Sequence, residues 1–196
     1  MLNLVLVSGL IAVVVVLVTM AYNKLVAAKN RFRNAYSQID VQLQRRYDLI
    51  PNLVETARGY MAHEKDTLTN VISARNQASS AARAAKAESG DADNITRLAQ
   101  AEGVLGGALG RLFAVAENYP DLKANATMQQ LMEELSSTEN RVSFARQAFN
   151  DAVMEYNIVR ERFPTALIAG PFGFATAQQL DISNVEARQP MRVSFQ

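Results

Sequence analysis

The first 23 residues of the chain contain no charged side chain. The apolar run from Leu2 to Tyr22 is long enough, at about 1.5 Å per residue, to cross a hydrocarbon layer of roughly 30 Å as a helix. A cleaved signal peptide is the competing interpretation. However, residues 1–3 offer no Lys or Arg, and Thr19-Met20-Ala21 makes a poor cleavage site. We therefore predict a transmembrane anchor over residues 1–23.

The anchor is expected to continue into the body of the protein as one rod. Neither glycine nor proline occurs between Gly9 and Pro51, so nothing in the sequence breaks a helix where the chain leaves the membrane. Pro51 lacks an amide proton and its ring crowds the carbonyl group of Tyr47, which predicts a kink there.

Three further helices follow from the spacing of apolar residues. They are predicted from Glu64 to about Ala87, from Ile95 to about Asn118, and from about Thr127 to Phe163, where Thr127 and Gln130 resemble a capping box. Spacings of three and four run through five heptads of the last helix and predict a coiled-coil seam with left-handed supercoiling. The seam comprises Met128, Leu131, Leu135, Thr138, Val142, Ala145, Phe149, Ala152, Tyr156, Val159 and Phe163.

The helical pattern ends at Pro164, and Pro171 and Pro190 break any later long element, so residues 164–196 are expected to be an extended C-terminal tail. Four apolar tail residues would be exposed unless they dock on the bundle, the membrane or another subunit. They are Leu167, Ile168, Phe172 and Phe174. The predicted fold is all-α: a transmembrane helix continuing into an antiparallel bundle of about four helices over residues 24–163, followed by an irregular tail.

Cations gather directly after the anchor, at Lys24, Lys29, Arg31 and Arg33. By the positive-inside rule they place the N-terminus outside the membrane and the bundle in the cytoplasm. A bundle in the periplasm is the alternative. Cations next to the membrane suit anionic lipid headgroups. Nucleic-acid binding is not expected, because the chain has neither a broad basic patch nor the stacking aromatics of a known module.

Several sequence blocks resemble the LemA family. They are Arg45-Arg46-Tyr47-Asp48-Leu49-Ile50-Pro51-Asn52-Leu53-Val54, His63-Glu64, Tyr119-Pro120-Asp121-Leu122-Lys123-Ala124-Asn125 and Arg162-Phe163-Pro164. They occur in the order found in the family, and the resemblance extends over nearly the whole chain. It implies a bacterial, membrane-anchored helical protein with its N-terminus outside, and a family for which no general activity is established.

Residues suited to catalysis or metal binding are scarce. The chain has no cysteine, and its one histidine, His63, is interpreted as a turn residue. A histidine-based metal site or catalytic triad therefore cannot be built within one chain. Glycines at 103, 106, 107 and 110 do not match a phosphate loop. They predict instead a close approach of two helices, within the chain or between copies. We expect no catalytic residue, no cofactor and no metal.

One charged cluster stands out, at Arg45, Arg46 and Asp48 with Asn52 beside it. Arg46 falls on an otherwise apolar position of its helix, so its charge must be paired or solvated. Two interpretations stay open: an ion pair with an acid of a neighbouring helix, or a contact with a partner subunit or a lipid headgroup. Arg45, Arg46, Asp48 and Asn52 are therefore the candidate residues for contact with a partner or lipid.

The pattern favours a membrane-anchored scaffold that self-associates into a homo-oligomer. Its basis is the long seam, the glycine-lined helix and the apolar tail. The alternative is an adaptor or accessory subunit that binds another, unidentified membrane or membrane-associated protein. An enzyme is the least supported class, because no convergent polar pocket is visible in the sequence.

Overall fold

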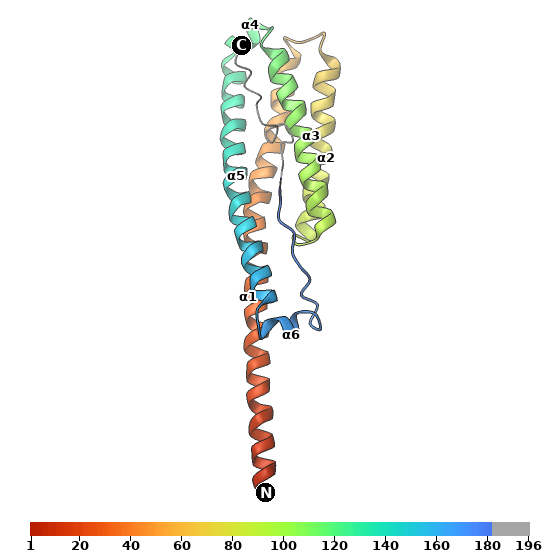
Figure 1. The fold of residues 1–196 in the computed structure, drawn as a ribbon. Helices are drawn as coiled ribbons and strands as arrows, with labels where there is room; N and C mark the ends of the chain where they lie inside the picture. Colours follow the sequence, from red (N-terminus) through yellow and green to blue (C-terminus); the bar gives the residue numbers. More distant parts are fainter. Residues whose placement is uncertain (182–196) are drawn as a thin grey trace, which may run out of the picture.

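The computed structural model describes residues 1–181, and this part of the chain is helical without a strand (Figure 1). The predicted all-α fold is confirmed. The helices are α1 (Leu2–Arg58), α2 (Lys65–Ala87), α3 (Ala92–Ala116), α4 (Pro120–Ala124), α5 (Ala126–Glu161) and α6 (Thr165–Ala169).

Helix α1 runs without interruption for 57 residues, which corresponds to about 85 Å. Its N-terminal part projects beyond every other element (Figure 1). Apolar side chains are exposed there, Leu10 at 67% and Val16 at 56%, whereas Ala21 and Leu25 begin a series of buried positions. In the described chain this is the one helix with the length and composition needed to cross a membrane.

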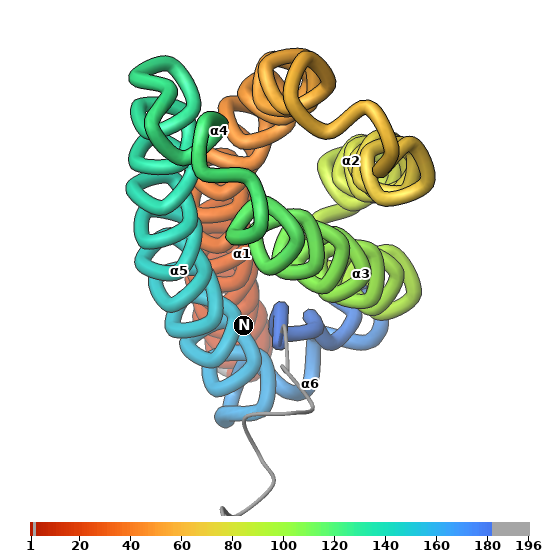
Figure 2. Tube along the Cα trace, turned by 90° about the horizontal axis from the view of Figure 1, so that it is seen from above, coloured from red at the N-terminus to blue at the C-terminus, as the bar shows by residue number. Residues whose placement is uncertain are grey.

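The bundle consists of two helix pairs, seen end-on in Figure 2. Helix α5 lies along α1, and α2 pairs with α3 and also contacts α1. Aromatic rings join the first pair, because Phe32 and Tyr36 of α1 stand edge-on to Phe149 of α5, with centroids 6.4 and 5.6 Å apart. Such pairs add stability beyond the area that they bury.

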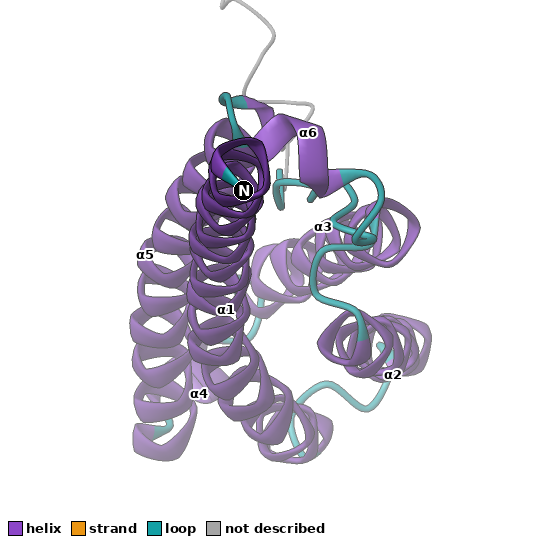
Figure 3. Cartoon of the chain, turned by 90° about the horizontal axis from the view of Figure 1, so that it is seen from below, coloured by secondary structure: helices purple, strands orange, loops and turns teal. Residues whose placement is uncertain are grey.

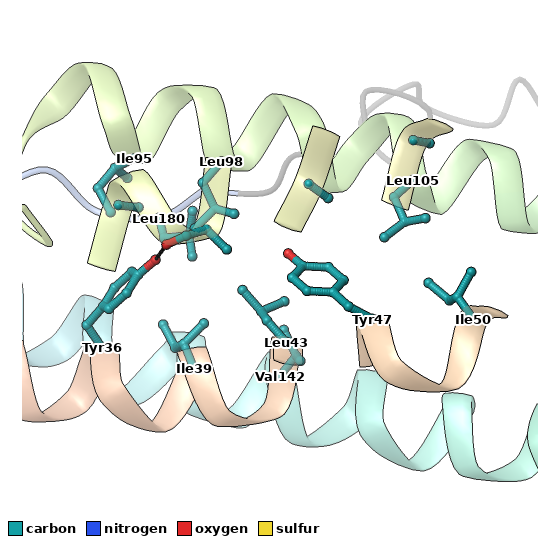
Figure 4. Close-up of a cluster of buried hydrophobic side chains, with 14 of the residues drawn as sticks. Tyr36, Ile39, Leu43, Tyr47, Ile50, Ile95, Leu98, Leu105, Val142 and Leu180 are labelled. Atoms are coloured by element: carbon teal, nitrogen blue, oxygen red, sulfur yellow. Dashed lines mark hydrogen bonds between the residues drawn. The ribbon is translucent and has the colours of Figure 1, made fainter. Parts of the chain in front are cut away.

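Side chains from both pairs meet in one continuous core (Figure 4). Tyr36, Leu43 and Tyr47 of α1 point toward Ile95, Leu98 and Leu105 of α3 in this view. The Tyr36 hydroxyl donates a hydrogen bond of 3.3 Å to the carbonyl oxygen of Ala82 in α2. The apolar stripes predicted on separate helices therefore pack against one another within a single chain.

Most of the seam predicted on the last helix is buried on α5, where Met128, Val142 and Tyr156 are among its covered members. Ala145 and Ala152 are partly buried. Phe163 is 82% exposed and lies beyond α5, which ends at Glu161.

The chain entering α5 differs from the prediction. Helix α3 ends at Ala116, two residues before the predicted end near Asn118, and Pro120 opens the short helix α4, where a proline is favoured in the first turn. The N-cap of α5 is Asn125, whose Oδ1 accepts a hydrogen bond of 2.9 Å from the amide of Met128. The predicted cap at Thr127 was therefore placed two residues too late.

The C-terminal tail is not extended from its start, because Thr165–Ala169 form the short helix α6. The Thr165 hydroxyl lies within hydrogen-bonding distance of the carbonyl oxygens of Arg162 and Val159, and donation to either stabilises this turn. The chain then runs back along α5, between the two helix pairs (Figure 1). The part of the predicted tail after Asp181 lies outside the described residues.

Two asparagines of α5 hold the returning segment. The Asn157 side chain donates to the carbonyl oxygen of Ala177 (2.9 Å) and accepts from the Ala177 amide (3.0 Å). Asn150 forms the same double contact with Leu180, at 3.2 and 2.8 Å. Each side-chain amide thus replaces the strand partner that a single extended segment lacks. The tail docks on its own bundle as far as Leu180, which is fully buried.

Replacing both asparagines, Asn150→Ala with Asn157→Ala, should release residues 174–181 from α5. Each lost hydrogen bond costs about 1 kcal/mol, so amide hydrogen exchange in this segment should become roughly tenfold faster or more. Hydrogen exchange read by mass spectrometry would measure the change. Gln147→Ala on the exposed face of α5 is the control, and equal exchange in all three proteins would contradict this account of the tail.

Candidate functional site: a buried ion pair beneath a glycine-lined groove

The site begins with the proline in α1. Pro51 cannot donate to the carbonyl oxygen of Tyr47 four residues earlier, so that oxygen needs another partner. Arg75 of α2 provides it, with a hydrogen bond of 3.0 Å from Nε. Arg75 also lies 3.8 Å from the Asp48 carboxylate. The gap that proline opens in the hydrogen-bond ladder of α1 thus becomes a point of attachment for α2, and α1 continues to Arg58.

Arg46 forms an internal ion pair, which is the first of the two interpretations of its position. Its Nη1 lies 3.0 Å from Oε2 of Glu102 in α3, and the two side chains are 9% and 1% exposed. The other carboxylate oxygen of Glu102 accepts a hydrogen bond of 2.5 Å from the Tyr47 hydroxyl. Both oxygens of Glu102 are therefore engaged by neighbouring residues of α1.

Glu102 was missed in the sequence, although a signal for it exists. It occupies the apolar stripe of α3, in sequence between Leu98 and Leu105, at the same spacing of three and four that the stripe follows. The base Arg46 on the apolar stripe of α1 and the acid Glu102 on that of α3 form one buried ion pair. Recognising both would have predicted that α1 and α3 face each other.

Burial governs the titration of this cluster. Desolvation raises the pKa of the Glu102 carboxyl above its ordinary value, against the opposing effects of the Arg46 charge and the Tyr47 hydrogen bond. Burial and the neighbouring carboxylate also raise the pKa of the Tyr47 phenol, so the hydroxyl stays a donor. The cluster is a satisfied polar network and contains no free base, because Glu102 could reach a ligand only by leaving its partners.

The other sequence candidates lie on the surface of α1. Arg45, Asp48 and Asn52 are exposed, and their spacing of three and four residues puts them on one face of the helix. Asp48 also accepts a hydrogen bond of 2.8 Å from Gln44. These three residues are exposed, whereas Arg46 is buried. His63 lies in the turn between α1 and α2, as predicted.

A groove of about 910 Å³ opens above the ion pair, between α2, α3 and α5. Gly103, Gly106, Gly107 and Gly110 of α3 line it, and Arg46 and Glu102 also reach its surface. Most of the other lining residues are polar, among them Asn70 and Gln77 of α2 and Glu139 and Ser143 of α5.

The glycine face of α3 has no close neighbour in residues 1–181. A Cβ atom built on any of the four glycines would meet no other atom within 4 Å. The close helix approach that these glycines predict therefore does not occur inside the described chain. Among the same residues, no three His, Asp or Glu side chains gather in a way that could hold a metal ion.

Glu102→Ala should destabilise the fold by about 3–5 kcal/mol, because it leaves the Arg46 guanidinium buried without a counter-charge. Removing both charges with Arg46→Met and Glu102→Leu should restore most of that loss. Unfolding by denaturant in detergent micelles, followed by circular dichroism, would measure both. Glu139→Ala, at an exposed acid of the same groove, is the control. If Glu102→Ala and Glu139→Ala changed the free energy of unfolding equally, the ion pair would not stabilise the fold.

Comparison with known proteins agrees with this architecture. Residues 35–195 match the sequence model of the LemA family. Magnetosome proteins MamQ 1 and MamQ 2 of Paramagnetospirillum magneticum are each 29% identical over 174 residues, which cover 81% of this chain and 64% of each relative. Protein LemA of Metamycoplasma hominis is 25% identical over 171 residues, covering 87% of this chain and 70% of that protein.

This chain therefore spans just under two thirds of the length of the two MamQ relatives. None of the three names states an enzymatic activity. The family match covers most of the chain and includes the motif around Asp48 and Pro51. The apolar part of α1 lies before the matched residues. This membrane-associated helical protein therefore belongs to the LemA family.

Proposed function

We propose that this chain is a membrane-anchored helical scaffold that self-associates into a homo-oligomer and has no catalytic activity of its own. The observation that carries the proposal is the open glycine face of α3 in the groove. The long seam of α5 no longer supports it, since that seam packs within the chain.

The energetics of the groove favour a second helix as its occupant. A glycine inside a helix costs up to about 1 kcal/mol relative to alanine, and α3 carries four of them on one face. No contact within the described chain offsets that cost, because no neighbouring atom uses the space. Small residues at spacings of three and four allow a second helix to approach closely enough for backbone and side chains to pack. The polar side chains along the groove could bond to such a helix.

The same chain also carries a candidate for the complementary surface. Phe144, Met154 and Ile158 of α5 are 73%, 51% and 38% exposed. Their positions along the helix bring them to one broad outer face. A ridge on one copy that enters the groove of the next gives a head-to-tail contact, which closes into a ring or grows into a filament. The relatives carry the two names MamQ and LemA in different bacteria, which suits a structural part used in more than one setting.

Residues 2–22 would anchor this assembly in the bacterial cell membrane as a single pass. Lys24, Lys29, Arg31 and Arg33 follow the span directly, and no acidic residue precedes Asp40. This asymmetry supports an N-terminus outside and a bundle in the cytoplasm. A bundle in the periplasm is the alternative arrangement.

Filling the groove should break the assembly without harming the fold. Gly107→Leu adds a side chain where no atom lies within 4 Å, and it raises helix propensity. The wild-type protein in mild detergent at micromolar concentration should scatter light as an oligomer, and Gly107→Leu should shift the mass toward the monomer with an unchanged or higher melting temperature. Ala84→Leu, at an exposed alanine of α2 that lies neither in the groove nor on the outer face of α5, should leave the mass unchanged.

A monomeric wild-type protein in this measurement would contradict the scaffold function, and the adaptor function would then be the remaining hypothesis. A photoreactive amino acid at Arg45 would then test the adaptor directly, because this side chain lies on the exposed face with Asp48 and Asn52. Adducts with another membrane protein would support an adaptor, and adducts with only this chain would support self-association.

A further inference from the structure

Helix α6 and the residues around it form a turn at the membrane-proximal end of the bundle (Figures 1 and 3). We call residues 162–173 the α6 turn. It contacts both α1 and the end of α5. Tyr22, the last residue of the apolar span, packs edge-on against Phe172 and Phe174 with ring centroids 5.4 and 5.6 Å apart. These contacts fix the α6 turn at the level where α1 leaves its apolar stretch.

The α6 turn exposes large apolar side chains and buries small ones, whereas a surface in water usually does the opposite. The residues that face the bundle are small, with Thr165 and Ala169 only 4% and 3% exposed. The residues that face away are large and apolar: Phe163 is 82% exposed, Leu167 67% and Phe172 54%. Apolar clusters of this kind mark sites of contact with a partner or a membrane.

The outward side chains cannot be covered by a small rearrangement of the turn. The Thr165 hydroxyl holds the backbone of Arg162, with an oxygen-to-oxygen distance of 2.7 Å. At the other end, Nε of Arg160 donates to the carbonyl oxygen of Phe174 at 2.8 Å. Phe174 points inward and is 5% exposed. Hydrogen bonds before and after the turn therefore fix its backbone with the apolar side chains facing outward.

The charges nearby are those of a surface that faces anionic lipid. From Phe163 to Leu180 the chain carries no charged residue, and from Met1 to Ile39 it carries cations without an acid. Lys24 and Arg33 are exposed beside the span, and Arg162 opens the turn. The end of α5 adds the carboxylates of Glu155 and Glu161, of which Glu155 is paired with Arg31. Cations therefore outnumber acids around an apolar turn, as in segments that lie in a membrane interface.

We propose that the α6 turn is a second membrane contact, which lies in the headgroup region of the same leaflet from which α1 emerges and inserts Phe163, Leu167 and Phe172 toward the acyl chains. The inference rests on the proposed anchoring of residues 2–22. Tyr22 and Phe172 would form part of the aromatic belt that membrane proteins place at this depth. With two contacts instead of one, the rod of α1 would hold a defined tilt and rotation relative to the bilayer.

The test uses the full chain, which has no native cysteine. Leu167→Cys carries an environment-sensitive fluorophore in proteoliposomes of phosphatidylethanolamine and phosphatidylglycerol. Nitroxide lipids labelled near the headgroup should quench it several-fold more strongly than the same label at Ala62→Cys, an exposed site in the turn between α1 and α2, at the end of the bundle away from the span. Phe172→Cys should behave like Leu167→Cys and serves as a second reporter if one variant folds poorly.

A label at Val14→Cys separates this inference from the anchoring on which it rests. Quenching at Val14 by nitroxides deep in the acyl chains, with Leu167 no more quenched than Ala62, would overturn the α6 contact alone. No quenching at Val14 would overturn the anchor itself. If Leu167 is shielded by a second copy and not by lipid, its blue-shifted emission should vanish on dilution into excess lipid without any nitroxide quenching, which also contradicts the proposal.

Discussion

The architecture depends on the continuity of α1. One helix without a break carries the chain from its apolar N-terminal stretch into the core of the bundle. Because backbone hydrogen bonds are satisfied along its length, the helix can leave an apolar environment for water without exposing unpaired groups. Other elements contact this rod directly: α5 lies along it, α2 contacts it, and α6 packs where its buried positions begin.

Pro51 and the charged Arg46 determine how α1 contacts α2 and α3. Apolar stripes alone allow neighbouring helices to slide by a turn at modest cost, whereas polar groups in the core accept few arrangements. The carbonyl oxygen that Pro51 leaves free is bonded by Arg75 of α2, and Arg46 and Tyr47 converge on Glu102 of α3. The α2/α3 hairpin is therefore held to α1 in one register, which leaves the glycine face of α3 open to the groove.

Periodic features of this fold could be predicted from the sequence, and contacts between distant residues could not. Heptad spacing reports which face of a helix is buried, so the helices and the buried members of the α5 seam were predictable. The double contacts of Asn150 and Asn157 with the tail, and the cap at Asn125, involve polar residues without a period. Helix α6 was missed because two flanking prolines and a short apolar run resemble an extended segment.

Only one of the two charged residues of the candidate site was predicted from the sequence. Arg46 drew attention as a charge on an apolar stripe, while Glu102, the same kind of exception on α3, was overlooked because each helix was considered alone. The glycines of α3 were recognised as steric, but the spacing of residues on one helix carries no information on whether a neighbour fills the space above them. That space is a property of how the two helix pairs meet.

The claim that one rigid helix links the apolar N-terminal segment to the bundle can be tested directly. Spin labels at Met20→Cys and Val41→Cys, both at exposed positions on α1, are 21 residues apart, which corresponds to about 32 Å along an unbroken helix. Pulsed electron spin resonance in proteoliposomes should give a single narrow distribution near that distance. A broad distribution, or one centred well below it, would show that α1 bends or breaks at the membrane surface and would contradict this account.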